Sequence, residues 1–449
     1  MANMNKSTSI TYENISFDIN GRKYKIVSST IKWNNKTNSL MYYVNEPDLS
    51  QDDMLVITKL KESLSKSNKK TLSNIGEIVK INTDLKKKNN IQTASAQDAI
   101  VNYYVYRDIF GYGKIEGLIW DSKVKFISYD RIGAPIMIFH EEYGVIPSNI
   151  IIASDNELSN LKKLLNDKCL YKTESKEMLN GETQTGAILF INKTTDTFTI
   201  RKIGDKVYHP TALIMKIGLA NVEMLSFIEF FLKNKGSILL IGPKYSNKTE
   251  FVSGLGSILG NSKILTLENV PEIKLLSENW ISEVLPAHVY TQSNIIENLI
   301  RQKPEYIIAD GIVGKDLKKI IAGVPKNYSG IITLEASSIE EGLKILTSDP
   351  INLDQSSIPN FDLIILLSVE KHGLRYLHRI KKIVEVLDYT IEDSKLKLNT
   401  VFNWDNKRDK FIPYRSLLIG KIVKKTGIRR SKIVEDLKNS VKFLRRLSR

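Results

Sequence analysis

Hydrophobic positions between residues 236 and about 370 follow two patterns in alternation. Short uninterrupted apolar runs, typical of buried strands, are followed by stretches with apolar residues three or four positions apart, which are typical of helices. This alternation predicts βα units, and hence an α/β domain with a mainly parallel sheet and helices on both faces. The predicted strands are 237–241, 264–267, 306–309, 330–333 and 363–367, and the predicted helices are 249–259, 294–301, 315–322 and 339–346.

The hydrophobic pattern divides the chain into three parts. Residues 1–110 have an alternating, β-rich lead-in, with a hairpin turn expected at Asn20-Gly21, followed by helical periodicity. Residues 111–235 mix short strand candidates with helices and predict a smaller α+β domain. Residues 236–449 form the α/β domain, which continues with antiparallel strands over 374–413 and a helical tail.

The loop between the first strand and the first helix of the α/β domain carries candidate chemistry. Its sequence, GPKYSNKT, matches the phosphate-binding template G-x-x-x-x-G-K-[ST] except at Asn247, which replaces the second glycine. Asn tolerates positive φ better than most residues, so the loop can still turn its N–H groups towards phosphates. The alternative is an ordinary strand-to-helix turn with a surface lysine. The predicted nucleotide-binding residues are Gly242, Pro243, Lys244, Tyr245, Ser246, Asn247, Lys248 and Thr249, and Thr249 is also the predicted Mg²⁺ contact.

Charge and composition add limits on the partners and the compartment. The net charge of +15 indicates an anionic partner, such as nucleic acid or lipid headgroups, or simply a solvated Lys-rich surface. A compact basic stripe interleaved with aromatic residues is missing from the sequence, so we expect no specific nucleic acid partner. One cysteine, Cys169, excludes a disulfide framework, and no apolar stretch reaches the length of a membrane span. The expected location is cytoplasmic.

Several separate stretches resemble one known family when taken together. They are GYGKIE at 111–116, FTIRK at 198–202, LTSDPIN at 346–352, FNWD at 402–405, and Leu267-Glu268-Asn269 followed by Glu278-Asn279-Trp280. Over roughly residues 100–449 the chain resembles the archaeal type II/IV secretion ATPases, the hexameric motors of archaella and archaeal pili. The resemblance implies a RecA-like P-loop domain that binds ATP with Mg²⁺. It also implies a homo- or hetero-hexamer of secretion ATPase subunits that works with a membrane-embedded platform protein, peripherally at the inner face of the cell membrane.

The departures from this family fall within its nucleotide site. Asn247 replaces a glycine of the loop, Gly311 stands where the family has the glutamate that polarises water, and Glu335 stands where it has a histidine. Phosphoryl transfer depends on positioning and electrostatics and tolerates few such losses. We therefore expect a pseudo-ATPase, a nucleotide-binding subunit with weak or absent hydrolysis and a structural or regulatory role. The alternative is an active hexameric motor that drives pilus or archaellum assembly or protein secretion.

Three further residues are candidates for roles at this site. Glu268 and Asp310 are the predicted catalytic carboxylates, although strand alternation suggests that Asp310 reaches the site only if the strand end shifts. Arg201 matches a family arginine, and the resemblance implies that it contacts phosphate across a domain or subunit interface. The alternatives are capping or ion pairing for the carboxylates and a surface ion pair for Arg201.

Overall fold

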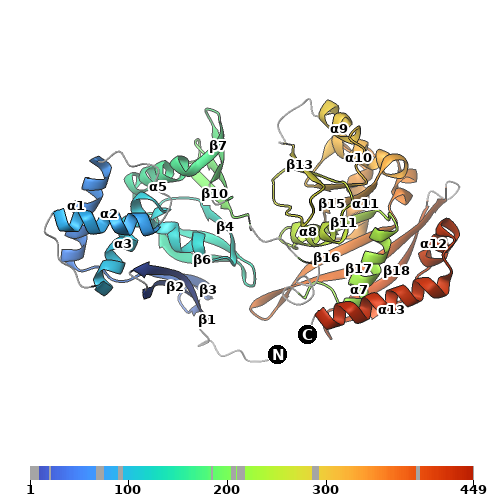
Figure 1. Ribbon diagram of the computed structural model, residues 1–449, viewed down its shortest axis with the longest axis horizontal. Helices are drawn as coiled ribbons and strands as arrows, with labels where there is room; N and C mark the ends of the chain where they lie inside the picture. The colour runs from blue at the N-terminus through green and yellow to red at the C-terminus, as the bar shows by residue number, and fades with distance from the viewer. Residues whose placement is uncertain are drawn as a thin grey trace. The chain divides into compact units, whose positions relative to one another are not determined.

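The protein forms two compact units, Met1–Gly204 and Asp205–Arg449 (Figure 1). The expected turn at Asn20-Gly21 lies outside the residues that the structure describes. The three-part division expected from the sequence stays a prediction. The structure, a computed structural model, describes residues 10–19, 22–66, 75–88, 95–183, 186–203, 209, 218–285, 293–390 and 395–447.

The first unit is built on a ten-stranded sheet in the order β1-β2-β3-β6-β5-β4-β10-β9-β8-β7. Its strands pair antiparallel except where β3 meets β6, through the parallel pair Tyr42 and Ser148. The alternating burial of β6 shows a sheet with one covered face. The strands are β1 (Ile10–Ile19), β2 (Arg22–Asn34), β3 (Ser39–Asn45), β4 (Val124–Tyr129), β5 (Pro135–His140), β6 (Gly144–Ile151), β7 (Cys169–Glu174), β8 (Met178–Thr183), β9 (Ile188–Asn192) and β10 (Thr197–Arg201). The helices are α1 (Gln51–Lys66), α2 (Ile75–Lys88), α3 (Ser95–Ile109), η1 (Gly113–Ile115), α4 (Glu116–Trp120) and α5 (Asp155–Lys168).

The second unit is built on a nine-stranded sheet in the order β13-β12-β14-β15-β11-β16-β17-β18-β19. Its strands are β11 (Ile238–Gly242), β12 (Ile264–Glu268), β13 (Trp280–Val284), β14 (Tyr306–Asp310), β15 (Ser329–Glu335), β16 (Leu363–His372), β17 (Arg375–Thr390), β18 (Lys395–Asp405) and β19 (Lys410–Pro413). Its helices are α7 (Val222–Lys233), α8 (Lys248–Ile258), α9 (Ser293–Ile300), α10 (Gly314–Asn327), α11 (Ile339–Thr347), η2 (Gln355–Asn360), α12 (Leu418–Thr426) and α13 (Arg430–Leu447).

This second sheet is mixed, so the expectation of a mainly parallel sheet needs correction. The strands from β13 to β16 pair parallel with their neighbours, whereas β17, β18 and β19 pair antiparallel. The change of direction has a local cause. Strand β16 ends at His372 and β17 begins at Arg375, with Gly373 at a φ of 63° between them. Such a short turn returns the chain only to an antiparallel neighbour.

Strand β11 is the central strand of the parallel part. It lies between β15 and β16, and all its residues are buried. Leu240 belongs to the same hydrophobic cluster as Phe251 of α8 and Phe231 of α7, whereas Leu239 on the other face clusters with Leu317 of α10. Because successive strand residues point to opposite faces, the two clusters are the two sides of the sheet. Helices therefore cover both faces, with α8 and α7 on one and α10 on the other (Figure 1).

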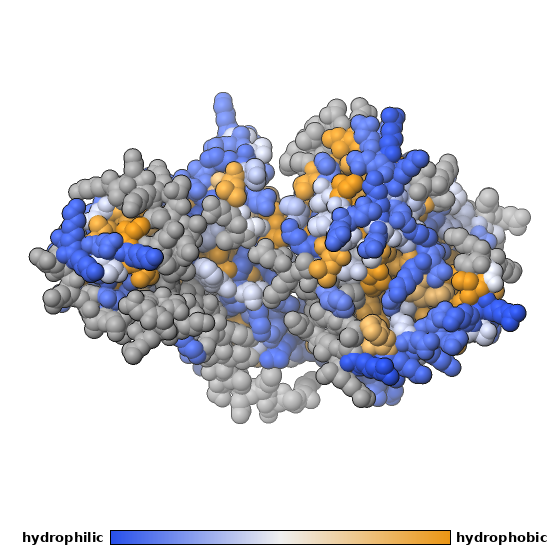
Figure 2. All heavy atoms as spheres, in the orientation of Figure 1, coloured by the Kyte–Doolittle hydropathy of each residue, from blue (hydrophilic) through white to orange (hydrophobic). Residues whose placement is uncertain are grey.

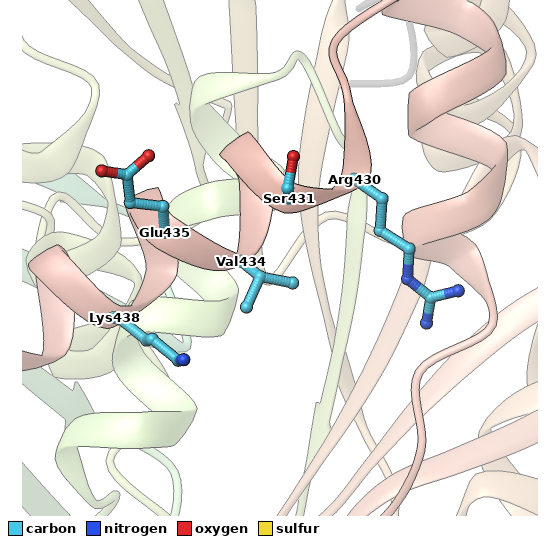
Figure 3. Close-up of a pocket in the computed structure, with 5 residues that line it drawn as sticks. All are labelled: Arg430, Ser431, Val434, Glu435 and Lys438. Carbon is cyan, nitrogen blue, oxygen red and sulfur yellow. The ribbon is translucent and has the colours of Figure 1, made fainter.

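The C-terminal helix α13 packs against α7 in the same unit (Figure 1). Leu444 is buried in the same hydrophobic cluster as Phe227 and Phe231 of α7, and Ser440 donates to Glu229 at 2.7 Å. Its outer face is hydrophilic (Figure 2). A shallow hollow of about 520 Å³ there is lined by Arg430, Ser431, Val434, Glu435 and Lys438, whose side chains do not converge on one point (Figure 3). Among the described helices, none combines the length and the apolar character needed to cross a membrane.

Candidate functional site

The phosphate-binding template loop lies at the carboxyl end of the central strand, where β11 leads into α8. Asn247, the residue that breaks the template, precedes α8 in the left-handed conformation, with φ of 62° and ψ of 35°. A glycine adopts this conformation without steric cost, and Asn is among the residues that tolerate it best. The substitution therefore preserves the backbone path that the template requires.

Gly242, the first glycine of the template, is required by close packing. A Cβ atom at this position would lie 2.5 Å from Ser246 Oγ and 3.0 Å from Leu367 Cβ. Ser246 Oγ in turn donates to the Pro243 carbonyl at 2.8 Å, which closes the loop on itself. Both glycine positions of the template are thus accounted for. Close packing at Gly242 leaves no room for a side chain, and Asn247 adopts the left-handed conformation required at the second position.

Two lysines supply the positive charge of the loop. The Lys248 ammonium group donates to the carbonyl oxygens of Gly242 and Pro243, both at 2.8 Å. It therefore lies inside the curve of the loop, beside the N-terminus of α8, where the helix dipole also favours an anion. Lys244 is exposed, and its Nζ lies 3.9 Å from Glu335 Oε1. This set of donors fits the phosphate groups of a nucleotide.

A chain of hydrogen bonds connects the loop to two neighbouring strands. Thr249 Oγ1 donates to Asp310 Oδ2 at 2.8 Å, and the Thr333 hydroxyl donates to the other oxygen of the same carboxylate. A P-loop threonine beside a strand-end aspartate is the pair that holds Mg²⁺ in P-loop proteins. The residues present thus fit a Mg²⁺-nucleotide. Thr333 was not predicted as part of the site, because only the pairing of β14 with β15 brings it to Asp310.

Asp310 faces the loop without any shift of its strand. Tyr306, Ile308 and Asp310 alternate to one face of β14, and the first two belong to the cluster that contains α8. The expectation that Asp310 needed a displaced strand end was therefore wrong. It rested on the family position of the glutamate, whereas the face is set by the alternation of this strand's own apolar residues. The catalytic role of Asp310 stays a prediction.

Glu268 is buried with a relative exposure of 0% at the end of β12, next to Asp310 in the β12–β14 register. Its Oε1 accepts from the backbone N–H groups of Glu272 and Ile273, at 2.9 and 2.7 Å, and its Oε2 has no hydrogen-bond partner among the residues that the structure describes. Burial raises the pKa of Glu268 to about 7, aided by the charges of Asp310 and Glu272 and opposed by the two backbone hydrogen bonds. A carboxyl group in this setting exchanges a proton near neutral pH. Its predicted catalytic role stays a prediction.

Gly311 occupies a position that does not favour a side chain. Its φ is 70°, and an added Cβ would lie 3.3 Å from Asn269 Cβ. Its backbone N–H donates to the Thr333 hydroxyl at 3.3 Å. A glutamate at this position would therefore require a strained backbone or a local rearrangement.

Arg201 is the last residue of β10, in the first unit, and it is exposed. The loop lies in the second unit. The expected contact of Arg201 with a phosphate stays a prediction.

Comparisons with known proteins give the following similarities. A family model described as "Uncharacterised conserved protein UCP018868" matches residues 203–395. The uncharacterized protein MJ1287 of Methanocaldococcus jannaschii is 26% identical over 246 residues, which are 53% of this chain and 91% of that protein. The uncharacterized protein MJ0900 of the same organism is 25% identical over 325 residues, which are 69% of this chain but only 58% of that protein.

Solved structures of type II/IV secretion ATPases also resemble the chain, at low sequence identity. The VirB11 ATPase of the Brucella suis type IV secretion system is 16% identical with a TM-score of 0.32, covering 59% of this chain and 92% of its own. The Legionella pneumophila ATPase DotB is 14% identical with a TM-score of 0.41, covering 71% of this chain and 84% of its own.

Proposed function

We propose that this protein is a nucleotide-binding subunit of the archaeal type II/IV secretion ATPase kind, with a RecA-like P-loop domain and weak or absent ATP hydrolysis. The binding part of the proposal is supported by the geometry of the loop. Asn247 keeps the backbone turn, Lys248 lies inside the loop, and Thr249 contacts Asp310. Each is a feature that a Mg²⁺-nucleotide site requires.

The proposal of weak or absent ATP hydrolysis rests on Gly311. Hydrolysis requires a group that orients the attacking water, and removing such an element costs orders of magnitude in rate. Gly311 has no side chain, and its φ of 70° disfavours one. Glu268, the buried carboxyl nearby, uses one oxygen to accept two backbone hydrogen bonds, which hold it in place at the end of its strand.

An active hexameric motor is the second candidate function. The bond between Thr249 and Asp310 favours it, because a preserved metal-binding pair is consistent with turnover. In that case Asp310 or Glu268 supplies the carboxylate that Gly311 does not. The two candidates differ in one measurable quantity, the rate of ATP turnover.

The partners and the location follow from the resemblance of the sequence stretches to the secretion ATPase family. We propose a homo- or hetero-hexamer with secretion ATPase subunits, acting with a membrane-embedded platform protein at the cytoplasmic face of the membrane. No specific nucleic acid is proposed. In this assembly the protein acts as a structural or regulatory subunit beside an active relative.

Two measurements on the purified full chain test the proposal. Calorimetric titration with Mg²⁺-nucleotide is expected to show binding that Lys248→Ala abolishes and that Lys233→Ala preserves, because Lys233 is an exposed lysine on α7. A turnover assay, with and without the platform protein, is expected to show a rate far below about 1 s⁻¹, the lower end for working enzymes. Unchanged binding in Lys248→Ala contradicts the site, and turnover at or above that rate contradicts the pseudo-ATPase.

A further inference from the structure

Three adjacent strands of the second sheet end in carboxylates at the edge that bears the loop. In the order β12, β14, β15, β11, the strands end with Glu268, Asp310, Glu335 and Gly242. Glu268 pairs in register with Asp310, and Glu335 pairs in register with Gly242, the first residue of the loop. The carboxylates therefore form a row that leads directly to the loop.

All three carboxylates project from the face of the sheet that α8 covers. Residues 264, 306 and 331 belong to the cluster that contains α8, and Glu268, Asp310 and Glu335 each lie an even number of positions further along the same strand. The Thr333 hydroxyl, two residues before Glu335, confirms this direction because it reaches Asp310. The row thus faces the same space as Thr249.

The positive groups of the site belong to the loop. Lys248 is held by the carbonyl oxygens of Gly242 and Pro243, inside the loop. Lys244 lies 3.9 Å from Glu335, and both side chains are more than half exposed, so solvent screens the pair. Positive charge is therefore concentrated within the loop, and negative charge is concentrated beyond Thr249 and along the ends of β14 and β15.

We propose that this site selects nucleoside diphosphates over nucleoside triphosphates, an inference that rests on the proposed nucleotide site. A P-loop backbone cradles the α- and β-phosphates, and a third phosphate adds on the side of the threonine and aspartate that hold Mg²⁺. On that side a third phosphate approaches Glu335, a carboxylate that is not part of the Thr249–Asp310 pair. Like charges repel, and because Glu335 is more than half exposed, solvent screens part of this repulsion.

The test compares a diphosphate with a non-hydrolysable triphosphate analogue on the full chain. Titration of ADP and of the analogue at equal Mg²⁺ is expected to give ADP a dissociation constant several-fold lower, because the additional charge of the triphosphate lies beside the partly exposed Glu335. Glu335→Gln is expected to improve affinity for the triphosphate several-fold and to leave that for ADP nearly unchanged. Because Glu335 is more than half exposed, this variant keeps the fold, which a thermal melt checks.

Glu283→Gln is the matched control. It removes the same charge from the same sheet, but Glu283 pairs with Leu267, on the face opposite to α8. It is expected to change neither affinity. Equal or tighter binding of the triphosphate analogue by the unmodified protein overturns the selectivity and leaves the nucleotide site standing. The same holds if Glu335→Gln shifts both affinities equally. Absence of binding by either nucleotide overturns the nucleotide site itself, and the selectivity with it.

Discussion

Thr249 at the start of α8 donates a hydrogen bond of 2.8 Å to Asp310 at the end of β14, 61 positions away in the chain. The bond closes the space between the loop and the neighbouring strands and identifies Asp310 as the partner of the loop threonine. Asp310→Asn is expected to weaken or remove the dependence of nucleotide affinity on Mg²⁺, because an amide is a poorer ligand for a hard cation than a carboxylate. Titrations with and without Mg²⁺ measure this effect. An undiminished Mg²⁺ dependence in the variant would assign the metal to other ligands.

Glu268 makes stability depend on pH. The folded protein holds the pKa of Glu268 at about 7, above its ordinary value of 4.5. Between these values the folded state binds more protons than the unfolded state, so the contribution of Glu268 to stability falls as pH rises through this window. Glu268→Gln removes the effect. The difference in free energy of unfolding, the Glu268→Gln variant minus the unmodified protein, is expected to rise from pH 5 to pH 8 by about 1–3 kcal/mol, since one pKa unit corresponds to about 1.4 kcal/mol.

Denaturant titrations at the two pH values measure this difference, and Glu283→Gln serves as the control for removing a carboxylate from another strand of the same sheet. A constant difference for Glu268→Gln across the same window would show that the carboxyl group titrates near its ordinary value.

Substitutions of Asn247 test whether the left-handed backbone conformation at this position governs nucleotide binding. Asn247→Gly is expected to keep or increase stability by up to about 1 kcal/mol, because glycine adopts the left-handed conformation without a Cβ penalty. Asn247→Val is expected to lower nucleotide affinity strongly, since β-branched residues disfavour positive φ. Thermal melts and titrations of the pair distinguish the two effects. Equal affinities of the Gly and Val variants would mean that the loop conformation does not govern binding.

The backbone conformation of Gly311 makes it costly to introduce a catalytic side chain at this position. Gly311→Ala is expected to destabilise the protein by about 1 kcal/mol or more, because the native φ is 70°. Gly420→Ala is the matched control, since Gly420 lies in helix α12, has no positive φ and has space around an added Cβ. For the same reason, Gly311→Glu combined with Glu335→His and Asn247→Gly is expected to lose stability, and turnover assays of this triple variant show whether any rate is recovered. If the Gly311→Ala variant is as stable as the control, a side chain at this positive φ causes no strain, and the prediction is wrong.

The sequence predicted the elements of the parallel sheet but not how they meet. The predicted strand 237–241 and helix 249–259 lie within one residue of β11 and α8, because continuous apolar runs and helical spacing are strong local signals. Strand β13 was missed since it lies at the edge of the sheet and is half exposed, so it has no apolar run. The contact of Asp310 with Thr249 and Thr333 depends on strand order, which no local pattern contains.

Strand β16 continues beyond the level at which its parallel neighbour stops. Ile241 pairs with Leu366, and residues 367–372 then pair only with β17, in a ladder that includes an ion pair between Lys381 and Glu370. On the opposite flank, β15 ends at Glu335, level with Gly242. The carboxyl edge of the sheet is therefore stepped, and residues 368–372 of β16 extend beyond the level of Gly242 by about 17 Å at 3.4 Å per residue. A molecule bound at the loop would therefore have the β16–β17 hairpin along one flank, whereas strand β15 does not extend beyond the start of the loop on the other.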